Sequence, residues 1–251
     1  MESFIKVEQR EELAVVRIDR PPANAISLDV VRQAIDVMAE LGTTDPGAVV
    51  LTGRDEFFSA GADLKLVPTL DADGQREMVD GINRLFGGWY SFPRPVVAAV
   101  NGHAIAGGLI LALAADYRVG ATEGKLGLTE LKAGVPYPAA AMCVVQAELT
   151  PAAARVLVFR NHLVEGDETL RLGLVDEVAP PAEVLDRALA VASELAVLPR
   201  SGYGLVKRQL RGPTIARIEQ VIAGEDPLVG SWLIEGTASA AANVLGKSPP
   251  G

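Results

Sequence analysis

Two glycine-containing stretches hold the groups that could do chemistry. The longer one begins as an apolar strand expected over 95–100, breaks at Asn101-Gly102, turns through Ala106-Gly107-Gly108 and continues as an apolar helix to Asp116. The first backbone N–H groups of a helix lack partners and lie at the positive end of its dipole, so they bind negative charge. A second stretch of related design, FSAGADL, occupies 58–64. The two stretches together are predicted to bind one oxygen atom.

Alternating strands and helices must position these stretches. Helices are predicted at 28–41, 75–86, 139–148 and 183–198, and strands at 13–19, 48–52, 95–100, 117–121 and 174–178. Such alternation implies parallel strands joined by right-handed crossovers, which is an α/β fold. Residues 67–74 are polar and contain Pro68 and Gly74, a composition that predicts a mobile loop.

Only helices are expected after about residue 178: the one at 183–198, followed by others at 203–210, 214–223 and 226–245. We therefore divide the chain into a core at 1–198 and a helical arm at 199–251. The arm could bury its apolar faces on the core or on another subunit.

Composition limits the possible functions. Hydrophobic residues make up 49% of the 251 residues, which supports a sizeable core, and the formal net charge of −9 argues against nucleic acids and anionic membranes. A single cysteine, Cys143, fits a reducing compartment. The N-terminal stretch is charged and shows no signal peptide, and we see no membrane-spanning run, so we expect a cytoplasmic protein.

Several familiar catalytic motifs are missing from the sequence. We find no G-x-S-x-G elbow, no phosphate-binding G-x-x-x-x-G-K-[ST] loop and no G-x-G-x-x-G fingerprint. With one cysteine and two histidines, a Cys/His metal site is not expected. His103 and His162 are interpreted as packing or surface residues.

Four segments, in this order along the chain, resemble the crotonase superfamily, the enoyl-CoA hydratase/isomerase family. They are RPPANAIS at 20–27, VVLTG at 49–53 with FSAGADL at 58–64, PVVAAVNGHAIAGG at 95–108, and GLTELKAGVP at 127–136. The resemblance implies an α/β crotonase-like (ClpP/crotonase) superhelix of ββα turns, with a C-terminal helical region that forms trimers. It also implies an acyl-CoA substrate, a homotrimer or dimer of trimers, and no cofactor besides the coenzyme A of the substrate.

The resemblance also assigns roles in the site. By motif position, the backbone N–H groups of Ala62 and Gly107 stabilise the negative thioester oxygen of an enolate. Lys65, Arg20 and the pair Lys207-Arg208 are candidates for the phosphates of coenzyme A. Further substrate contacts are expected from Ala23, Ala25, Ala60, Asp63, Leu64, Lys65, Gly108 and Ile110.

One acidic residue stands where the family's hydratases have two. The hydratases orient water with two glutamates, and the corresponding positions here are Ile110 and Glu130. A single carboxylate suits a proton shuttle, and the motifs are most similar to mitochondrial-type 3-enoyl-CoA to 2-enoyl-CoA isomerases. We therefore expect Glu130 to move a proton from C2 to C4, with a pKa raised by an apolar pocket.

Other functions remain open on this sequence. Hydration of 2-enoyl-CoA is the first alternative, and a non-catalytic acyl-CoA-binding protein is the second. A different enolate reaction, such as decarboxylation or dehalogenation, could use the same oxygen-binding groups. Asp63 and Asp116 are interpreted as structural residues that hold loop N–H groups, and Tyr137 as ordinary packing.

Overall fold

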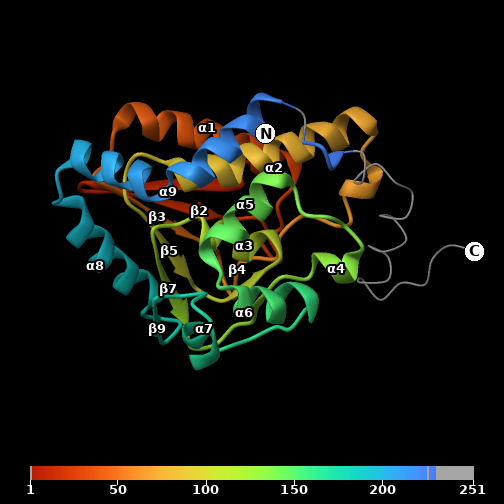
Figure 1. Ribbon diagram of the computed structural model, residues 1–251. Helices are drawn as coiled ribbons and strands as arrows, with labels where there is room; N and C mark the ends of the chain where they lie inside the picture. The colour runs from red at the N-terminus through yellow and green to blue at the C-terminus, as the bar shows by residue number, and fades with distance from the viewer. Residues whose placement is uncertain (1, 225, 230–251) are drawn as a thin grey trace, which may run out of the picture.

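A six-stranded sheet forms the centre of the computed structural model, which describes residues 2–224 and 226–229 (Figure 1). β1 pairs with β2 in antiparallel fashion, and all the other pairs are parallel. In spatial order the strands are β1 (Ile5–Arg10), β2 (Leu13–Ile18), β3 (Ala48–Thr52), β5 (Val96–Val100), β7 (Tyr117–Ala121) and β9 (Glu177–Ala179). The predicted parallel α/β arrangement is confirmed, although the sequence did not indicate the strand at Ile5–Arg10.

A second, smaller parallel sheet contains β4 (Phe57–Ser59), β6 (His103–Ile105) and β8 (Leu126–Gly127). Each of these strands follows a strand of the large sheet along the chain: β4 follows β3, β6 follows β5 and β8 follows β7. The chain therefore alternates between the two sheets and generates the expected superhelix. None of the small strands was predicted, because two or three residues show no usable periodicity.

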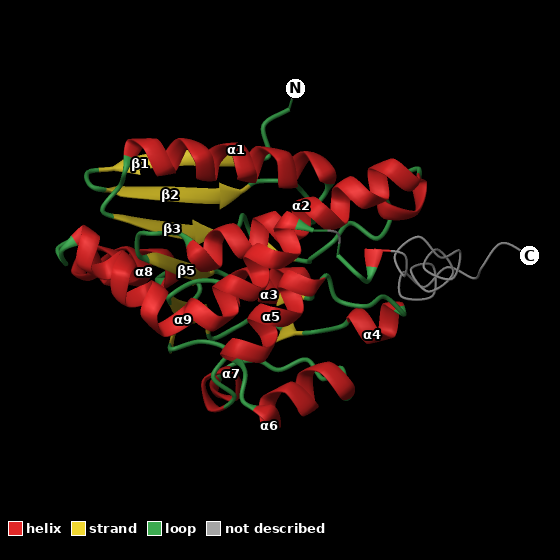
Figure 2. Cartoon of the chain, turned by 45° about the horizontal axis from the view of Figure 1, so that its top comes forward, coloured by secondary structure: helices red, strands yellow, loops and turns green. Residues whose placement is uncertain are grey.

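Helices cover both faces of the large sheet (Figures 1 and 2). Val49 and Leu51 of β3 point into the larger hydrophobic cluster, whereas Ala48 and Val50 point into a smaller one formed with α8. This alternation follows from the two-residue period of a strand, and it explains why the sequence of β3 is apolar throughout. The α-helices are α1 (Leu28–Thr44), α2 (Ala72–Ser91), α3 (Gly107–Leu113), α4 (Glu130–Ala133), α5 (Ala139–Glu148), α6 (Pro151–Ala154), α7 (Asp167–Arg171), α8 (Val184–Ala196) and α9 (Arg200–Ala223).

The prediction of a mobile loop at 67–74 is wrong. A short 3₁₀ helix spans Val67–Thr69, and α2 already begins at Ala72. Asp71 caps α2, because its Oδ1 accepts the N–H of Gly74 at 2.8 Å. The segment is thus ordered by two helices: Thr69 ends the 3₁₀ helix, and Asp73 lies in the first turn of the 20-residue helix α2.

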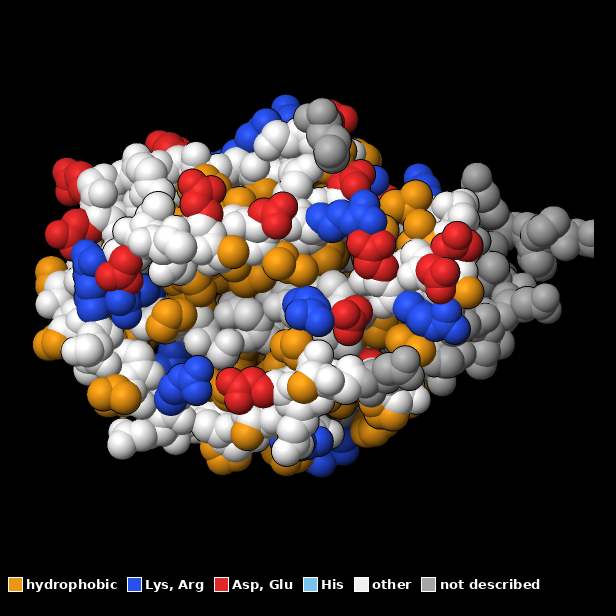
Figure 3. All heavy atoms as spheres, turned by 90° about the horizontal axis from the view of Figure 1, so that it is seen from above, with side chains coloured by type: hydrophobic (Ala, Val, Ile, Leu, Met, Phe, Trp, Pro, Cys, Tyr) orange, Lys and Arg blue, Asp and Glu red, His pale blue; other side chains and the backbone are white. Residues whose placement is uncertain are grey.

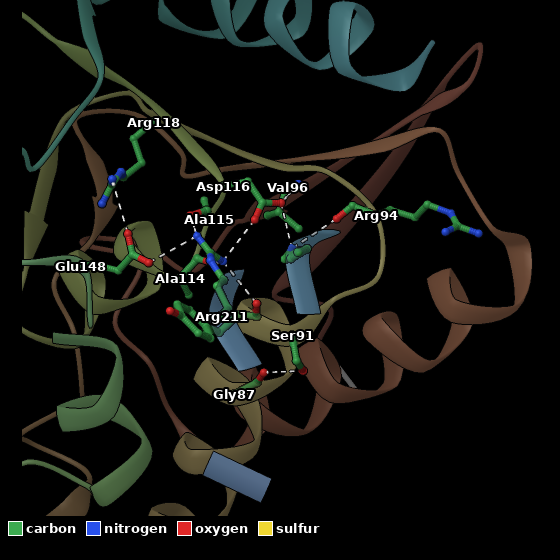
Figure 4. Close-up of polar contacts among 12 residues, drawn as sticks. Gly87, Ser91, Arg94, Val96, Ala114, Ala115, Asp116, Arg118, Glu148 and Arg211 are labelled. Carbon is green, nitrogen blue, oxygen red and sulfur yellow. Dashed lines mark hydrogen bonds and ion pairs between the residues drawn. The ribbon is translucent and has the colours of Figure 1, made fainter. Parts of the chain in front are cut away.

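The two helices predicted at 203–210 and 214–223 are one continuous helix, α9, with Pro213 inside it. Buried contacts hold α9 in place: the guanidinium of Arg211 donates to the carbonyl oxygens of Tyr90, Ala114 and Ala115 (Figure 4). These contacts offset the loss of the backbone hydrogen bond that Pro213 cannot donate within the helix. The helix expected over 226–245 lies outside the described residues from residue 230 onward, and the division of the chain at 198/199 stays a prediction.

Charged groups are buried where α9 meets the core. Asp116 Oδ2 accepts the N–H of Val96 at 2.8 Å, and this carboxylate also pairs with Lys207 Nζ at 2.8 Å and with Arg211 at 3.1 Å. Asp116 is therefore structural, as expected. Lys207 is not free to bind coenzyme A, which corrects its candidacy as a phosphate ligand.

Basic and acidic side chains are interspersed on the face that carries α1 and the end of α9, with a band of hydrophobic side chains between them (Figure 3). A continuous basic patch is not visible on this face. Within the described ranges, no helix combines the length and the apolar character that a membrane span requires.

Candidate active site

A cavity of about 530 Å³ brings together the two glycine-containing stretches, the segment after β2, the α4 region and one face of α2. Of the residues expected to contact substrate or catalyse, those that line it are Ala23, Ala25, Ala60, Ala62, Asp63, Leu64, Lys65, Gly107, Ile110 and Glu130. Gly108 is not among the lining residues. A Cβ at Gly108 would lie 2.1 Å from the carbonyl oxygen of Ser59, so this glycine permits α3 to pack on β4.

The backbone directs the N–H groups of Ala62 and Gly107 away from regular hydrogen bonding. Each follows a residue with a left-handed φ: 78° at Gly61 and 52° at Ala106. Gly107 opens α3, so its N–H has no partner within the helix. In the part of the chain that the structure describes, neither N–H donates to a backbone or side-chain acceptor. Both are available to a ligand oxygen in the cavity.

Hydrogen bonds fix the first of these turns on the segment around Ile26, and close backbone packing brings the second turn against it. Ile26 donates its N–H to the carbonyl oxygen of Gly61 at 2.8 Å and accepts the N–H of Asp63 at 3.0 Å. The neighbouring turn approaches so closely that a Cβ on Gly61 would lie 2.9 Å from the nitrogen of Gly107. The two donor groups therefore belong to adjacent pieces of backbone, as expected for a shared oxygen.

Glu130 is the first residue of α4 and lines the cavity. The residue as a whole retains some exposure, but its Oε2 is buried and has no hydrogen-bond partner among the described residues. Loss of solvation raises the pKa of its carboxyl group to about 7, although the N–H groups of Glu130 and Thr129 and the hydroxyl of Tyr137 act in the opposite direction. A carboxyl group with this pKa can both accept and return a proton near neutral pH.

Three charged residues besides Glu130 line the cavity, and we call them the polar part of its wall: Arg20, Asp63 and Lys65. Arg20 pairs with Asp63 at 2.8 Å, and Asp63 Oδ1 also accepts the N–H groups of Lys65 and Leu66. Asp63 thus holds the loop that follows Ala62, as expected. Lys65 is exposed, and no ion pair engages it within the described ranges. Arg208 instead pairs with Glu219 beside a separate cavity of about 490 Å³, between α1, α2 and α9.

The sequence did not indicate most of the apolar wall. Ile82 and Phe86 come from α2, and Ala133, Val135 and Pro138 come from α4 and the loop after it. The helical pattern around Ile82 shows an apolar face but cannot show which of its residues meet a cavity. Within the described ranges, no group of three or more His, Cys, Asp or Glu side chains is arranged to hold a metal ion.

Comparison with known proteins agrees with this geometry. The family model described as enoyl-CoA hydratase/isomerase matches residues 8–235. The chain is 35% identical to a Mycobacterium avium protein named probable enoyl-CoA hydratase echA17, over 85% of this chain and 84% of that one.

Solved structures show the same fold. One is named probable enoyl-CoA hydratase ECHA3 from Mycobacterium tuberculosis, with a TM-score of 0.84, 29% identity, and 88% of this chain and 94% of that chain covered. Another is human mitochondrial delta3-delta2-enoyl-CoA isomerase, with a TM-score of 0.89, 25% identity, and 97% of each chain covered. The chain therefore belongs to the enoyl-CoA hydratase/isomerase family of the crotonase superfamily.

Proposed function

We propose that this protein converts 3-enoyl-CoA thioesters into 2-enoyl-CoA thioesters, as a step in fatty acid metabolism. The observation that carries the proposal is that only one carboxyl group in the cavity wall is not engaged in an ion pair among the described residues. Among the described residues that line it, Asp63 and Glu130 are acidic, and Asp63 is already paired with Arg20. Glu130 is thus left as the base, and by motif position Ile110 stands where the hydratases have their other glutamate.

In the proposed reaction, Glu130 removes a proton from C2 of the substrate. The electron pair moves onto the thioester oxygen and leaves a dienolate. The N–H groups of Ala62 and Gly107 then stabilise the negative oxygen, and one such donor contributes on the order of 3 kcal/mol to a transition state. Glu130 finally returns the proton to C4, and the double bond moves from C3–C4 to C2–C3.

The apolar wall supports a proton shuttle over the addition of water. Ile110, 1% exposed, and Phe86, 2% exposed, line the same cavity as Glu130. Hydrocarbon side chains cannot orient a water molecule, whereas they keep the proton on the carboxyl group between the two steps.

Coenzyme A binding is assigned to the polar part of the wall. Lys65 is the favoured partner for its phosphates, because it lines the cavity and is exposed. Assembly as a homotrimer or a dimer of trimers through the helical arm also remains part of the proposal. No other cofactor is needed, since coenzyme A belongs to the substrate.

Hydration of 2-enoyl-CoA is the second candidate, because two of the three relatives described above carry hydratase names. The deciding experiment gives the purified protein a 3-enoyl-CoA and a 2-enoyl-CoA side by side. Rapid isomerisation with negligible hydration, abolished in Glu130→Gln, supports the proposal. Faster hydration than isomerisation would overturn it, and binding without either reaction would indicate a non-catalytic protein.

A further inference from the structure

Tyr137 is a buried polar residue that the proposed mechanism does not use. It lies in the loop between α4 and α5, and the residue is only 7% exposed. Its hydroxyl oxygen is buried and has no hydrogen-bond partner among the described residues. Val135 and Pro138 on either side of it line the cavity, but Tyr137 does not. A phenol hydroxyl buried without a partner is unfavourable, so this one requires an explanation.

The backbone brings Tyr137 back toward Glu130. Gly134 ends α4 with a left-handed φ of 65°, and the N–H of Val135 donates to the carbonyl oxygen of Glu130 at 3.1 Å. The chain therefore reverses immediately after α4. This reversal returns the residues after Gly134 to the side of Glu130.

The two side chains interact. The hydroxyl of Tyr137 lowers the pKa of Glu130, while burial and the negative charge of Glu130 raise the pKa of Tyr137. Glu130 Oε2 and the Tyr137 hydroxyl are both buried, and neither has a hydrogen-bond partner among the described residues, so an acceptor and a donor are both left unsatisfied in this region. Hydrogen bonds of this kind are often long in an empty site and shorten when substrate binds.

No charged side chain contributes to the shift at Glu130. Lys132 lies on α4 itself. A π-helical turn, Arg155–Phe159, packs against α4; Arg155 is its first residue, and Arg160 caps its C-terminal end. Arg20, Asp63 and Lys65 line the cavity. None of these six is a cause of the shift, so Tyr137 is the titratable side chain that acts on Glu130 within the described residues.

We propose that Tyr137 is a positioning residue of the active site: its hydroxyl donates to Oε2 of Glu130 and holds the carboxyl group so that Oε1 faces the substrate. The inference rests on the proposed function, in which Glu130 is the base. The hydrogen bond is compatible with both stages of the shuttle. Oε2 accepts from Tyr137 whether Oε1 is ionised or carries the proton taken from C2.

The test is Tyr137→Phe, which removes one oxygen atom and keeps the ring. A hydrogen bond to the ionised carboxylate stabilises it, and its loss moves the pKa of Glu130 upward by about one pH unit. The acidic limb of the pH profile of kcat/KM should therefore move upward by that amount. Below the limb kcat/KM should fall about tenfold, and at high pH it should approach that of the wild type.

A matched control is Tyr203→Phe. Tyr203 is a half-buried tyrosine whose hydroxyl also interacts with a carboxylate, that of Asp116, but it does not line the cavity. This variant should leave the acidic limb where it is in the wild type. A merely structural role for Tyr137 would instead lower kcat/KM by the same factor at every pH, and that result would overturn the inference.

A second measurement separates this inference from the proposed function. Carbon-13 NMR of protein labelled at the glutamate carboxyl carbons follows the titration of Glu130 directly, with Glu130→Gln identifying its signal. An upward shift in Tyr137→Phe supports the inference even if the wild type does not isomerise 3-enoyl-CoA. An unchanged titration contradicts it even if the wild type is an efficient isomerase.

Discussion

Gly61 lies directly against the backbone nitrogen of Gly107, so that a Cβ on Gly61 would come within 2.9 Å of that nitrogen and 2.8 Å of the carbonyl oxygen of Ile105. Its φ of 78° also disfavours any side chain. The residue that precedes one proposed oxygen-binding N–H therefore controls the position of the other.

Gly61→Ala should displace both donor groups and lower kcat about 100-fold, which corresponds to the loss of one such donor. Gly42→Ala is the matched control, because a Cβ there meets nothing within 4 Å and the position is helical. That variant should keep full activity and gain up to about 1 kcal/mol in unfolding free energy. Steady-state kinetics and thermal unfolding measure both effects, and normal turnover by Gly61→Ala would contradict the proposed oxygen site.

Glu130 should reduce the stability of the fold at alkaline pH. Its pKa in the folded protein is about 7, above the ordinary value of 4.5, so the folded state binds the extra proton between these values. Unfolding free energy therefore falls as pH rises from 4.5 through 7. Glu130→Gln removes this penalty and should exceed the wild type by about 3 kcal/mol at pH 8.

The advantage of Glu130→Gln should vanish below pH 4.5, where the carboxyl group is neutral in both states. Urea unfolding at a series of pH values measures the difference. Glu165→Gln, at an exposed position outside the cavity, should follow the wild type throughout. Equal stability of Glu130→Gln and the wild type at pH 8 would mean that the carboxyl group is well solvated.

Long apolar runs made much of the fold predictable. The β3 and β5 sequences are apolar throughout because both faces are covered, and the turns around Gly61 and Gly107 were identifiable from their small residues. The sequence around Pro213 predicted two helices where the structure has one. Tertiary contacts of Arg211 stabilise the continuous helix there. The proposed role of Tyr137 could not be predicted, because it depends on the chain reversal after α4 that returns the chain to Glu130, and no local sequence pattern reports such a reversal.

Lys65→Ala tests the assignment of the phosphate ligand. If Lys65 binds the phosphates of coenzyme A, KM should rise about tenfold and kcat should stay near that of the wild type, since the lysine does not touch the reacting atoms. The wild-type KM should also rise with salt concentration. Lys125→Ala is the control, an exposed lysine outside the cavity, and it should leave KM unchanged. An equal KM for both variants would move the role to Arg20.

Lys207→Met tests the buried charges under α9. Desolvation lowers the pKa of Lys207 to about 8, yet its contact with Asp116 at 2.8 Å favours the charged form. Removing one partner of a buried ion pair lowers the unfolding free energy by about 3–5 kcal/mol. We expect about 3 kcal/mol here, because Arg211 still pairs with Asp116. Tm should fall by about 6–12 °C. Arg208→Met, beside it but exposed in its pair with Glu219, should change Tm little.

Ile110→Glu addresses the difference between the two reactions of the family. Ile110 and Glu130 line the same cavity, so a second carboxyl group there could orient a water molecule with Glu130. Such a group in a position that is 1% exposed should cost a few kcal/mol in stability and lower isomerisation, while hydration of 2-enoyl-CoA becomes measurable.

Ile110→Gln distinguishes the effect of a carboxyl group from the effect of polarity alone. Glutamine is similar to glutamate in size and polarity but cannot act as a base. Hydration by Ile110→Glu alone would show that the missing acid limits the wild type to moving a proton. Hydration by both variants would show that Glu130 suffices as the base once water can enter. Hydration by neither, with isomerisation retained in the wild type, would place the barrier in the shape of the wall formed by Phe86 and Val135.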